Sequence, residues 1–278
     1  MLSNVMEMKR GAGAYVLPEL PSEMLPIDEY DEVHVNVSGG ADSVATVLVA
    51  LHDYRIPKEK IKLVHMRVDG DPNSGKRPLF DWPQTDEFLE YLSKALDLPL
   101  IVIWDELGLE GRIRERGMFP SSQCRFCTSY LKRDVYAKWV RQFDNIKILL
   151  LTGERSEEST ERSEKPIFRL HSAHKTRRKN RLVHWLTPIK HMLKTEVRQL
   201  CADYGIELHP CYQWVSRCSC KFCIFNTSSE MSRTSQLFPE DWAYLKEMEQ
   251  ELGHTMKSKD GMSHSLSAFI KEDQIAFF

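Results

Sequence analysis

The hexapeptide Ser-Gly-Gly-Ala-Asp-Ser at residues 38–43 constrains the fold of this chain more than any other feature. It follows residues 32–37, whose alternating apolar pattern predicts a strand. It precedes residues 44–51, an apolar run that predicts a buried helix. The sequence therefore predicts a strand, a tight glycine loop and a helix in direct succession.

The side chains of this loop have the build of a phosphate cradle. Gly39 and Gly40 permit a sharp turn and a close approach of the backbone to a ligand. Ser38 and Ser43 add hydroxyl donors, and the N-terminus of the following helix attracts anions. Asp42 beside a polyphosphate suggests a magnesium ion between them. The purely structural alternative is a glycine turn that caps a core helix.

Further strands are expected along the first two thirds of the chain. Together with residues 32–37 they would form a five-stranded sheet: residues 61–68, 98–104, 146–152 and 183–186. Helical patterns separate the strands, so we expect an α/β fold whose parallel sheet is flanked by helices on both faces. Ligands bind beyond the carboxyl ends of such strands, where the loop at residues 38–43 falls.

A charged segment, residues 153–162, follows the expected fourth strand at the same edge. Gly153 lets the chain leave the sheet, and Arg155 and Arg162 are suited to clamp phosphate oxygens. Glu158 and its neighbour are suited to hold these arginines or a magnesium ion. The alternative is a solvated helix start whose charges pair with each other.

The seven cysteines are confined to residues 124–223 and include two Cys-x-x-Cys pairs. Each pair, Cys124 with Cys127 and Cys220 with Cys223, has the spacing of metal ligands. Zinc and an iron–sulfur cluster both suit four thiolates, and buried unligated thiols are the bland alternative.

Composition and organisation exclude several other classes. The net charge is −2, and no apolar run is long enough to span a bilayer, so we expect a soluble cytoplasmic protein without a membrane partner. We expect an N-terminal arm at residues 1–30, a nucleotide-binding domain at 31–190 and a smaller helical, cysteine-rich region at 191–278. A basic stretch at residues 171–181 suits either a solvated loop or contact with nucleic acid.

Four motifs carry a family resemblance that covers roughly residues 31–226. Residues 38–43 resemble the PP-loop of the N-type ATP pyrophosphatases. Residues 153–162 resemble the Gly-x-Arg-x-x-Glu-Ser-x-x-Arg signature of the PAPS reductase family. Residues 125–132 and 212–223 resemble two further segments of that family, the second less closely. The resemblance implies a Rossmann-like fold of the HUP type.

The resemblance also implies ATP and Mg²⁺ as cofactors. The phosphates would lie on residues 38–43, with Gly153, Arg155, Glu158 and Arg162 on a second side. The adenine would lie near Met66 and Arg67. The residues expected to act in catalysis are Asp42, Lys132 and Arg155.

For the metal, the resemblance favours a [4Fe–4S] cluster, with Zn²⁺ as the alternative. Cys127, Cys220 and Cys223 match the family segments best. The fourth ligand would be Cys124, with Cys218 and Cys211 as rivals, or there would be none.

The sequence departs from the family pattern in one respect that bears on function. Sulfonucleotide reductases of this family use a nucleophilic cysteine in a C-terminal segment, and this sequence has none after Cys223. We therefore expect cleavage of ATP between the α- and β-phosphates to adenylylate a substrate, for sulfur transfer to a nucleic acid or nucleotide. A sulfur donor protein and a homo-oligomer are further expected partners. The alternatives are a sulfonucleotide (PAPS or APS) reductase relative and a nucleotide-sensing or nucleic-acid-binding module without turnover.

Overall fold

The computed structural model describes residues 15–259 and 262–270, and it divides into two compact units. The first unit consists of Met1–Met66, Gln84–Ile103 and Tyr136–Pro210. The second consists of Arg67–Pro83, Trp104–Val135 and Cys211–Phe278. The units interleave along the chain. The first fourteen residues of the expected arm lie outside the described residues.

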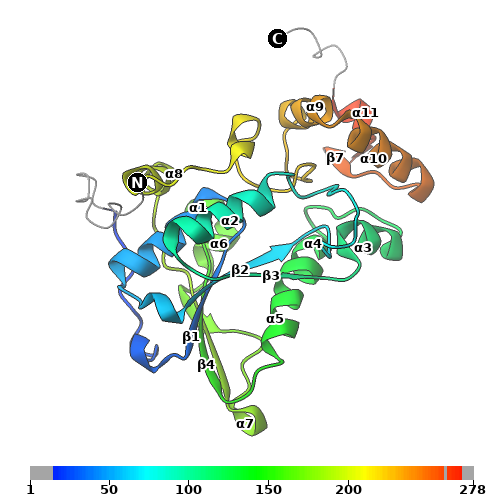
Figure 1. Ribbon diagram of the computed structural model, residues 1–278. Coiled ribbons are helices and arrows are strands. Elements are labelled where there is room, and N and C mark those ends of the chain that lie inside the picture. Colours follow the sequence, from blue (N-terminus) through cyan, green and yellow to red (C-terminus); the bar gives the residue numbers. More distant parts are fainter. Residues whose placement is uncertain (1–14, 260–261, 271–278) are drawn as a thin grey trace. The chain divides into compact units, whose positions relative to one another are not determined.

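A six-stranded sheet in the order β3-β2-β1-β4-β6-β5 forms the centre of the first unit (Figure 1). Its strands are β1 (Glu32–Asn36), β2 (Ile61–Arg67), β3 (Leu100–Trp104), β4 (Ile146–Leu151), β5 (Phe168–Leu170) and β6 (Arg181–Leu186). The pairs β1–β2, β1–β4 and β4–β6 are parallel, and β5 is antiparallel to β6. The expected α/β class is confirmed, but the expectation of five strands is wrong because the three-residue edge strand β5 carries too short a pattern to be recognised.

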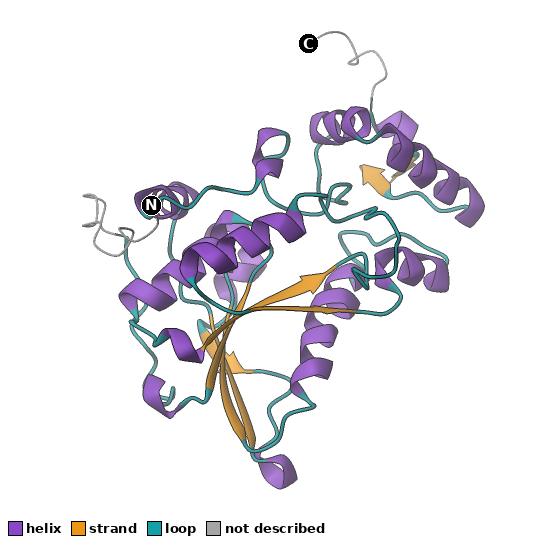
Figure 2. Cartoon of the chain, in the orientation of Figure 1, coloured by secondary structure: helices purple, strands orange, loops and turns teal. Residues whose placement is uncertain are grey.

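Helices cover both faces of this sheet (Figures 1 and 2). The helix α1 (Ala41–Leu48) is buried along nearly its whole surface, and α8 (Lys194–Asp203) packs against it. A short π-helical turn, Val49–Asp53, continues α1. The helices α2 (Thr85–Leu96) and α5 (Asp134–Val140) make the crossovers that bring the chain into β3 and β4. A helix whose residues are buried on nearly all sides, as in α1, needs to be enclosed in this way.

The two faces of β1 show why this strand lies in the interior. Val33 and Val35 are fully buried on one face. On the other face, His34 Nδ1 lies 2.8 Å from the Tyr136 hydroxyl of α5, and its Nε2 lies 2.7 Å from Glu32. Burial lowers the pKa of His34, although hydrogen bonding to Glu32 opposes the shift. The strand therefore buries an imidazole with hydrogen-bond partners on both ring nitrogens.

The second unit is mostly helical. It contains α3 (Gly108–Arg116), α4 (Phe126–Thr128), α9 (Ser228–Leu237), α10 (Pro239–Leu252), α11 (Leu266–Phe269) and a hairpin of β7 (Lys257–Lys259) and β8 (Met262–His264). Its core includes Phe119, Phe222, Trp242 and Leu245. The expected helix from Pro239 to Leu252 is confirmed, as is a C-terminal helical region.

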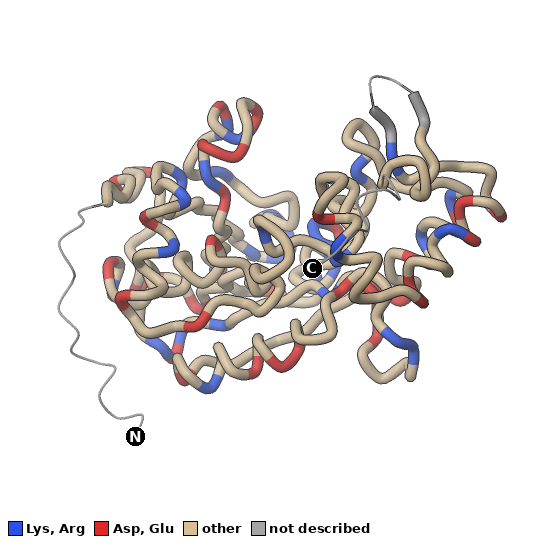
Figure 3. Tube along the Cα trace, turned by 90° about the horizontal axis from the view of Figure 1, so that it is seen from above, with Lys and Arg blue, Asp and Glu red and all other residues tan. Residues whose placement is uncertain are grey.

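No helix among the described residues combines the length and apolarity needed to cross a bilayer. Acidic and basic residues alternate along the trace rather than separating into blocks (Figure 3). This distribution agrees with the small net charge of −2.

Candidate functional site

The loop of residues 38–43 lies at the carboxyl end of β1, which pairs with β2 on one side and β4 on the other. The strand order reverses between β1 and β4, and ligands of open α/β sheets bind at such a switch point. Gly39 has a φ of +81°, a conformation that disfavours any side chain. The Ser43 hydroxyl donates to the Gly40 carbonyl at 2.7 Å and accepts from the Ser38 amide at 3.3 Å. These bonds close the loop on itself.

The N-terminus of α1 has no side-chain cap, because Gly40 occupies the N-cap position. An uncapped helix N-terminus offers amide donors and a partial positive charge to an anion. Ser43 is buried within the first turn and holds the turn through its bond to Gly40. The loop and the helix start thus have the local geometry of an anion-binding site.

Gly153 lies directly after β4 and lets the carboxyl end of this strand pack closely against the loop of residues 38–43. A Cβ at Gly153 would lie 2.7 Å from the Asp42 carbonyl oxygen and 3.0 Å from Thr46 Oγ1. The Thr46 hydroxyl already donates to that same carbonyl at 2.8 Å. Only glycine permits this approach of the two chain segments. The predicted juxtaposition of residues 38–43 and 153–162 is therefore present.

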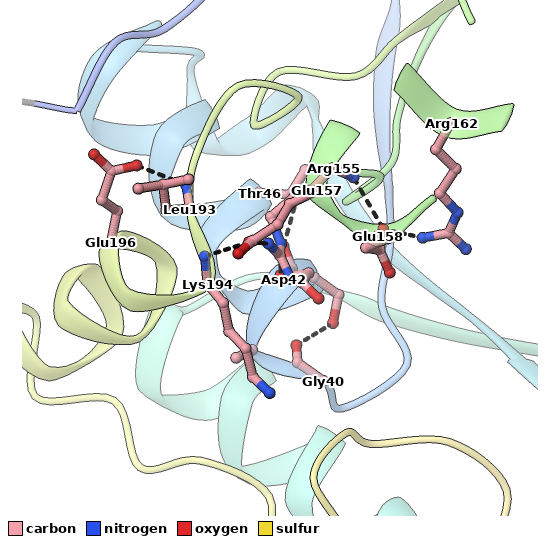
Figure 4. A network of polar contacts seen from close by, with 12 residues as sticks. Gly40, Asp42, Thr46, Arg155, Glu157, Glu158, Arg162, Leu193, Lys194 and Glu196 are labelled. Carbon is pink, nitrogen blue, oxygen red and sulfur yellow. Dashed lines mark hydrogen bonds and ion pairs between the residues drawn. The ribbon is translucent and has the colours of Figure 1, made fainter. Parts of the chain in front are cut away.

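A network of ion pairs joins the charged segment to the loop (Figure 4). Arg155 is buried, and its Nε donates to Asp42 Oδ1 at 2.5 Å. Its Nη1 pairs with Glu157, whose carboxylate also accepts from the Lys194 amide at the start of α8 at 2.9 Å. The Arg155 amide donates to Glu158 at 3.0 Å. Asp42, Arg155 and Glu157 thus connect the first turn of α1 to that of α8.

These partners refine the expected role of the arginines. Arg162 pairs with Glu158, and Arg155 pairs with two carboxylates. Burial raises the pKa of Asp42, although the Arg155 guanidinium opposes the shift. The segment therefore combines both interpretations of the sequence: its charges pair with each other, and one of them also reaches the glycine loop.

The residues expected near the adenine lie at the carboxyl end of β2. Met66 is half-buried, and Arg67, the last residue of the strand, is buried. The strand paired with β2 in the sheet, β1, leads into the glycine loop. No described feature tests their contact with a base, so this assignment stays a prediction.

The basic stretch lies at the opposite edge of the sheet from the glycine loop. It forms the hairpin between β5 and β6, with α7 (Thr176–Lys179) at its tip. The Lys179 carbonyl accepts from the Asn145 amide, immediately before β4 begins. Arg181 is buried and donates to the carbonyls of Ala173 and Phe143. Part of this basic stretch is therefore structural.

In the second unit, the two Cys-x-x-Cys pairs meet on one hydrophobic core. Cys124, Cys127 and Cys220 all pack on the cluster that contains Phe126 and Phe222. All four cysteines of the pairs are half-buried. The pairs are separated by more than ninety positions along the sequence, so their convergence is a property of the fold.

Burial disfavours the deprotonated form of Cys127 and Cys220, and a nearby lysine opposes this in part. Burial raises the pKa of Cys127, and the Lys132 ammonium opposes this shift. Burial also raises the pKa of Cys220, again opposed by Lys132, while the Cys223 thiol acts on both. Lys132, Cys127, Cys220 and Cys223 therefore lie within electrostatic range of one another.

The rival fourth ligands lie in a separate cluster. Cys211 packs with Trp82 and Val215, and Cys218 packs against that group. Their Sγ atoms lie within 4.8 Å of each other. His209 precedes Cys211 by two residues, so this short segment supplies nitrogen and sulfur donors of the kinds that zinc takes. Cys124, in contrast, shares the cluster of Cys127 and Cys220.

Lys221 lies between Cys220 and Cys223 and anchors this loop to other segments of the second unit. Its side chain is 1% exposed, and Nζ donates to Asp241 Oδ2 at 2.7 Å and to the Pro78 carbonyl at 2.9 Å. Its amide donates to the Phe80 carbonyl at 2.7 Å. Sequence reasoning missed this role, and the only available signal was a lysine between two metal-spaced cysteines.

Lys257, in β7, binds the backbone of the same loop. Its Nζ donates to the carbonyls of Ile224 and Asn226 at 2.8 and 2.7 Å and to that of Cys223 at 3.3 Å. Burial lowers the pKa of Lys257 to about 8, so the side chain remains largely cationic at neutral pH. Nothing in the sequence near Lys257 indicated this contact.

Comparison with known proteins identifies similar sequences and structures. The family model described as phosphoadenosine phosphosulfate reductase domain matches residues 32–216. An uncharacterized 37.8 kDa protein of Escherichia phage 186 is 30% identical over 141 residues, which cover 49% of this chain and 40% of that protein. The chain thus spans about two fifths of that relative's length. A crystal structure of phosphoadenylyl-sulfate (PAPS) reductase from Candida auris, a phosphate complex, has a TM-score of 0.42 and 11% identity, covering 67% of this chain and 79% of that one.

Proposed function

Because the chain belongs to the phosphoadenosine phosphosulfate reductase domain family, we propose that it is an adenine-nucleotide enzyme that binds ATP on residues 38–43. It cleaves ATP between the α- and β-phosphates and transfers the adenylyl group to an acceptor. The acceptor is then modified with sulfur. This proposal separates the chain from family members that reduce a sulfonucleotide.

The observation that carries the proposal is the complete glycine loop packed against Gly153. The loop has both glycines, both serines and Asp42, and it closes through the Ser43 hydroxyl. Gly153 approaches it so closely that no side chain fits. A triphosphate needs such a run of backbone amides and hydroxyls at a helix N-terminus.

The proposed reaction balances without a redox step. A carbonyl oxygen of the acceptor attacks the α-phosphorus, the bond from this phosphorus to the oxygen bridging to the β-phosphate breaks, and pyrophosphate leaves. Hydrosulfide then attacks the activated carbon, and AMP leaves with the former carbonyl oxygen. The products are a thiocarbonyl, AMP and pyrophosphate, and a sulfur donor protein supplies the hydrosulfide. Positioning and charge neutralisation account for catalysis of such a transfer.

The residues divide into those that contact nucleotide and those that position them. Ser38, Ser43 and the loop amides bind phosphate, and Asp42 is suited to hold Mg²⁺ through its carboxylate. Arg155 fixes Asp42 and is itself fixed by Glu157. Its buried ion pairs support a positioning role for Arg155 over direct contact with phosphate.

The cysteine pairs fit an iron–sulfur cluster. Cys124, Cys127 and Cys220 pack on one core cluster, and Cys223 lies within electrostatic range of Cys127 and Cys220. Lys132 lies within electrostatic range of Cys127 and Cys220, and Lys257 within that of Cys223, so both supply positive charge near these thiols. Cys124, Cys127, Cys220 and Cys223 would hold a [4Fe–4S] cluster, one thiolate on each iron. Zn²⁺ is the alternative for the same donors.

The test is the product pattern of ATP turnover with the full chain. We expect AMP and pyrophosphate in equal amounts, resolved by phosphorus NMR, and a loss of at least about tenfold in rate for Asp42→Asn. Lys165→Ala, which removes the exposed ion pair with Glu161, is the matched control and retains the rate. Release of ADP, or tight ATP binding without any cleavage, would contradict the proposal.

A second candidate is reduction of a sulfonucleotide, favoured by the family match over residues 32–216. In that case PAPS or APS is the substrate and a thioredoxin thiol supplies the electrons. Sulfite release from PAPS, with no pyrophosphate from ATP, would favour this candidate over the first.

A further inference from the structure

Phe225 is exposed on the second unit and carries two arginines on its ring. Its side chain is 41% exposed, the only phenylalanine or tryptophan among the described residues in the exposed class. The Arg125 guanidinium carbon lies 5.1 Å from the ring centroid and that of Arg217 lies 5.5 Å away. We call Arg125, Arg217 and Phe225 the Arg–Phe platform.

The two arginines of the Arg–Phe platform lack carboxylate partners within the described part of the chain. Among the described residues, the Arg125 guanidinium donates to the Thr128 hydroxyl at 3.4 Å, and Arg217 meets the Phe225 ring and forms no ion pair. Other arginines of the same unit behave differently: Arg112 pairs with Asp105 and Glu115, and Arg114 pairs with Glu110 and Glu251. The platform therefore keeps two uncompensated positive charges beside an exposed aromatic face.

The position of the Arg–Phe platform relates it to the cysteine pairs. Arg125 lies between Cys124 and Cys127 in the chain, and Phe225 follows Cys223 by two residues. The loop that carries Phe225 is held by Lys257 through the Ile224 and Asn226 carbonyls. The exposed ring is therefore presented by a fixed backbone at the border of the cysteine site.

We propose that the Arg–Phe platform binds single-stranded nucleic acid, with phosphates on the two arginines and an unstacked base on Phe225 or the guanidinium planes. This inference rests on the proposed function, since it names the class of acceptor that receives the sulfur. It commits to a nucleic acid because the platform offers two chemistries together. Cations attract phosphate, and a base stacks favourably on an exposed aromatic ring or on a guanidinium plane.

Two other partners fit less well. An acidic peptide would satisfy the arginines but would leave the Phe225 ring uncovered, and duplex bases remain stacked with each other and inaccessible. The basic hairpin at residues 171–181 is a rival nucleic-acid surface. Its exposed Arg177 and Arg178 have no aromatic ring from the described residues stacked on them.

The experiment measures binding of fluorescein-labelled oligonucleotides of about 20 nucleotides to the anaerobically purified full chain, without ATP. We expect single-stranded RNA or DNA to bind more tightly than the matched duplex and than a poly-glutamate peptide. Phe225→Ala should weaken single-strand binding about 5- to 100-fold, and Phe225→Tyr should retain it. Arg125→Ala and Arg217→Ala should each lower the slope of log affinity against log salt by about 0.7.

The matched control is Arg233→Ala, which removes an exposed arginine of α9 outside the platform and should leave affinity unchanged. Equal affinity for single strands and duplex, or an effect of Arg177→Ala in place of Phe225→Ala, would overturn the inference. Preference for poly-glutamate would overturn it too. Because ATP is absent, failure of ATP cleavage would refute the proposed function while leaving this binding result intact.

Discussion

The two compact units hold their functional segments by different means. In the first unit, the glycine loop is held by backbone proximity at Gly153 and by an ion-pair network that extends to the surface at Glu157. In the second, the Cys220–Cys223 loop is held by Lys221 and Lys257, whose ammonium groups are almost fully buried. The first arrangement leaves the start of α1 without a side-chain cap, whereas the second anchors the cysteine loop through two buried lysines.

Under the proposed function, the difference corresponds to what each site would bind. A nucleotide would enter and leave, so its loop would need open donors, and Glu157, 49% exposed, brings one end of the buried Arg155 pairs to solvent. A resident metal centre needs preorganised ligands and compensation for thiolate charge in a dry environment. The comparison therefore predicts a large loss of stability when the buried Lys221–Asp241 pair of the second unit is broken and a smaller one at the partly exposed Arg162–Glu158 pair of the first.

The largest effect is expected at Asp241, which has one buried and one exposed partner. It binds the buried Lys221, while Arg77, with a 59% exposed side chain, lies at 2.5 Å on its other oxygen. Asp241→Leu leaves the Lys221 ammonium without its counter-ion and should cost about 3–5 kcal/mol. Hydrogen exchange of α10 measures this loss within the second unit.

The matched control at this site is Arg77→Ala, which should cost under about 1 kcal/mol because solvent screens the exposed pair. The double variant Lys221→Met with Asp241→Leu should recover much of the lost stability. Equal costs for Asp241→Leu and Arg77→Ala would break the contrast between buried and exposed charge.

The pH dependence of stability at Glu230 tests the same contrast between buried and exposed charge. Burial raises its pKa, but hydrogen bonds from the Ser216 and Thr227 amides outweigh this and lower the pKa to about 2. The lowered pKa contributes about 3 kcal/mol of stability above pH 4.5, and this is lost as pH falls towards 2. Glu230→Gln should flatten the acid dependence of α9 exchange, whereas Glu247→Gln, at an exposed position, should not.

In the first unit, Gly153→Ala tests backbone proximity. The added Cβ meets the Asp42 carbonyl, so the loop has to shift. We expect ATP affinity to fall about 10- to 100-fold by isothermal titration. Gly205→Ala is the control. An added Cβ there meets no atom within 4 Å, and because φ is +66° the substitution should lower stability without changing ATP affinity. Unchanged ATP affinity in Gly153→Ala would remove the loop from the proposed site.

The smallest effect is expected for Arg162→Ala. This arginine pairs with Glu158 on a partly exposed surface of α6 (Thr160–Glu164). Its removal should change the free energy of unfolding of the first unit by under about 1 kcal/mol, measured by urea denaturation. A cost above about 2 kcal/mol would show that this network is as tightly coupled as the lysines of the second unit.

Local patterns predicted the glycine loop because its information is contiguous. Alternation in residues 32–37 and the loop that follows specify a strand, a turn and a helix without reference to distant residues. The same locality predicted α10 with correct ends, since Pro239 begins it and Gly253, at φ +58°, ends it. The family match over residues 32–216 agrees with the resemblance inferred from the sequence motifs.

Distant contacts were not predictable in this way. Lys257 reaches carbonyls more than thirty positions earlier, and Arg155 bonds to Asp42 across 113 positions. The strand β5 was missed because three residues carry no period, and its pairing with β6 is decided by the hairpin. The interleaving of the units likewise depends on packing, because the loop composition of residues 69–75 marks the end of a strand but not the unit that the segment joins.

The central claim is that the first unit binds nucleotide while the second carries a cluster on its four paired cysteines. Anaerobic purification followed by iron, sulfide and zinc analysis tests it most directly, with Cys220→Ser beside the unaltered chain. We predict about four irons and four sulfides per chain, with a visible absorption band that Cys220→Ser abolishes. A colourless chain that holds about one zinc, or none, and is unaffected by Cys220→Ser would contradict the account.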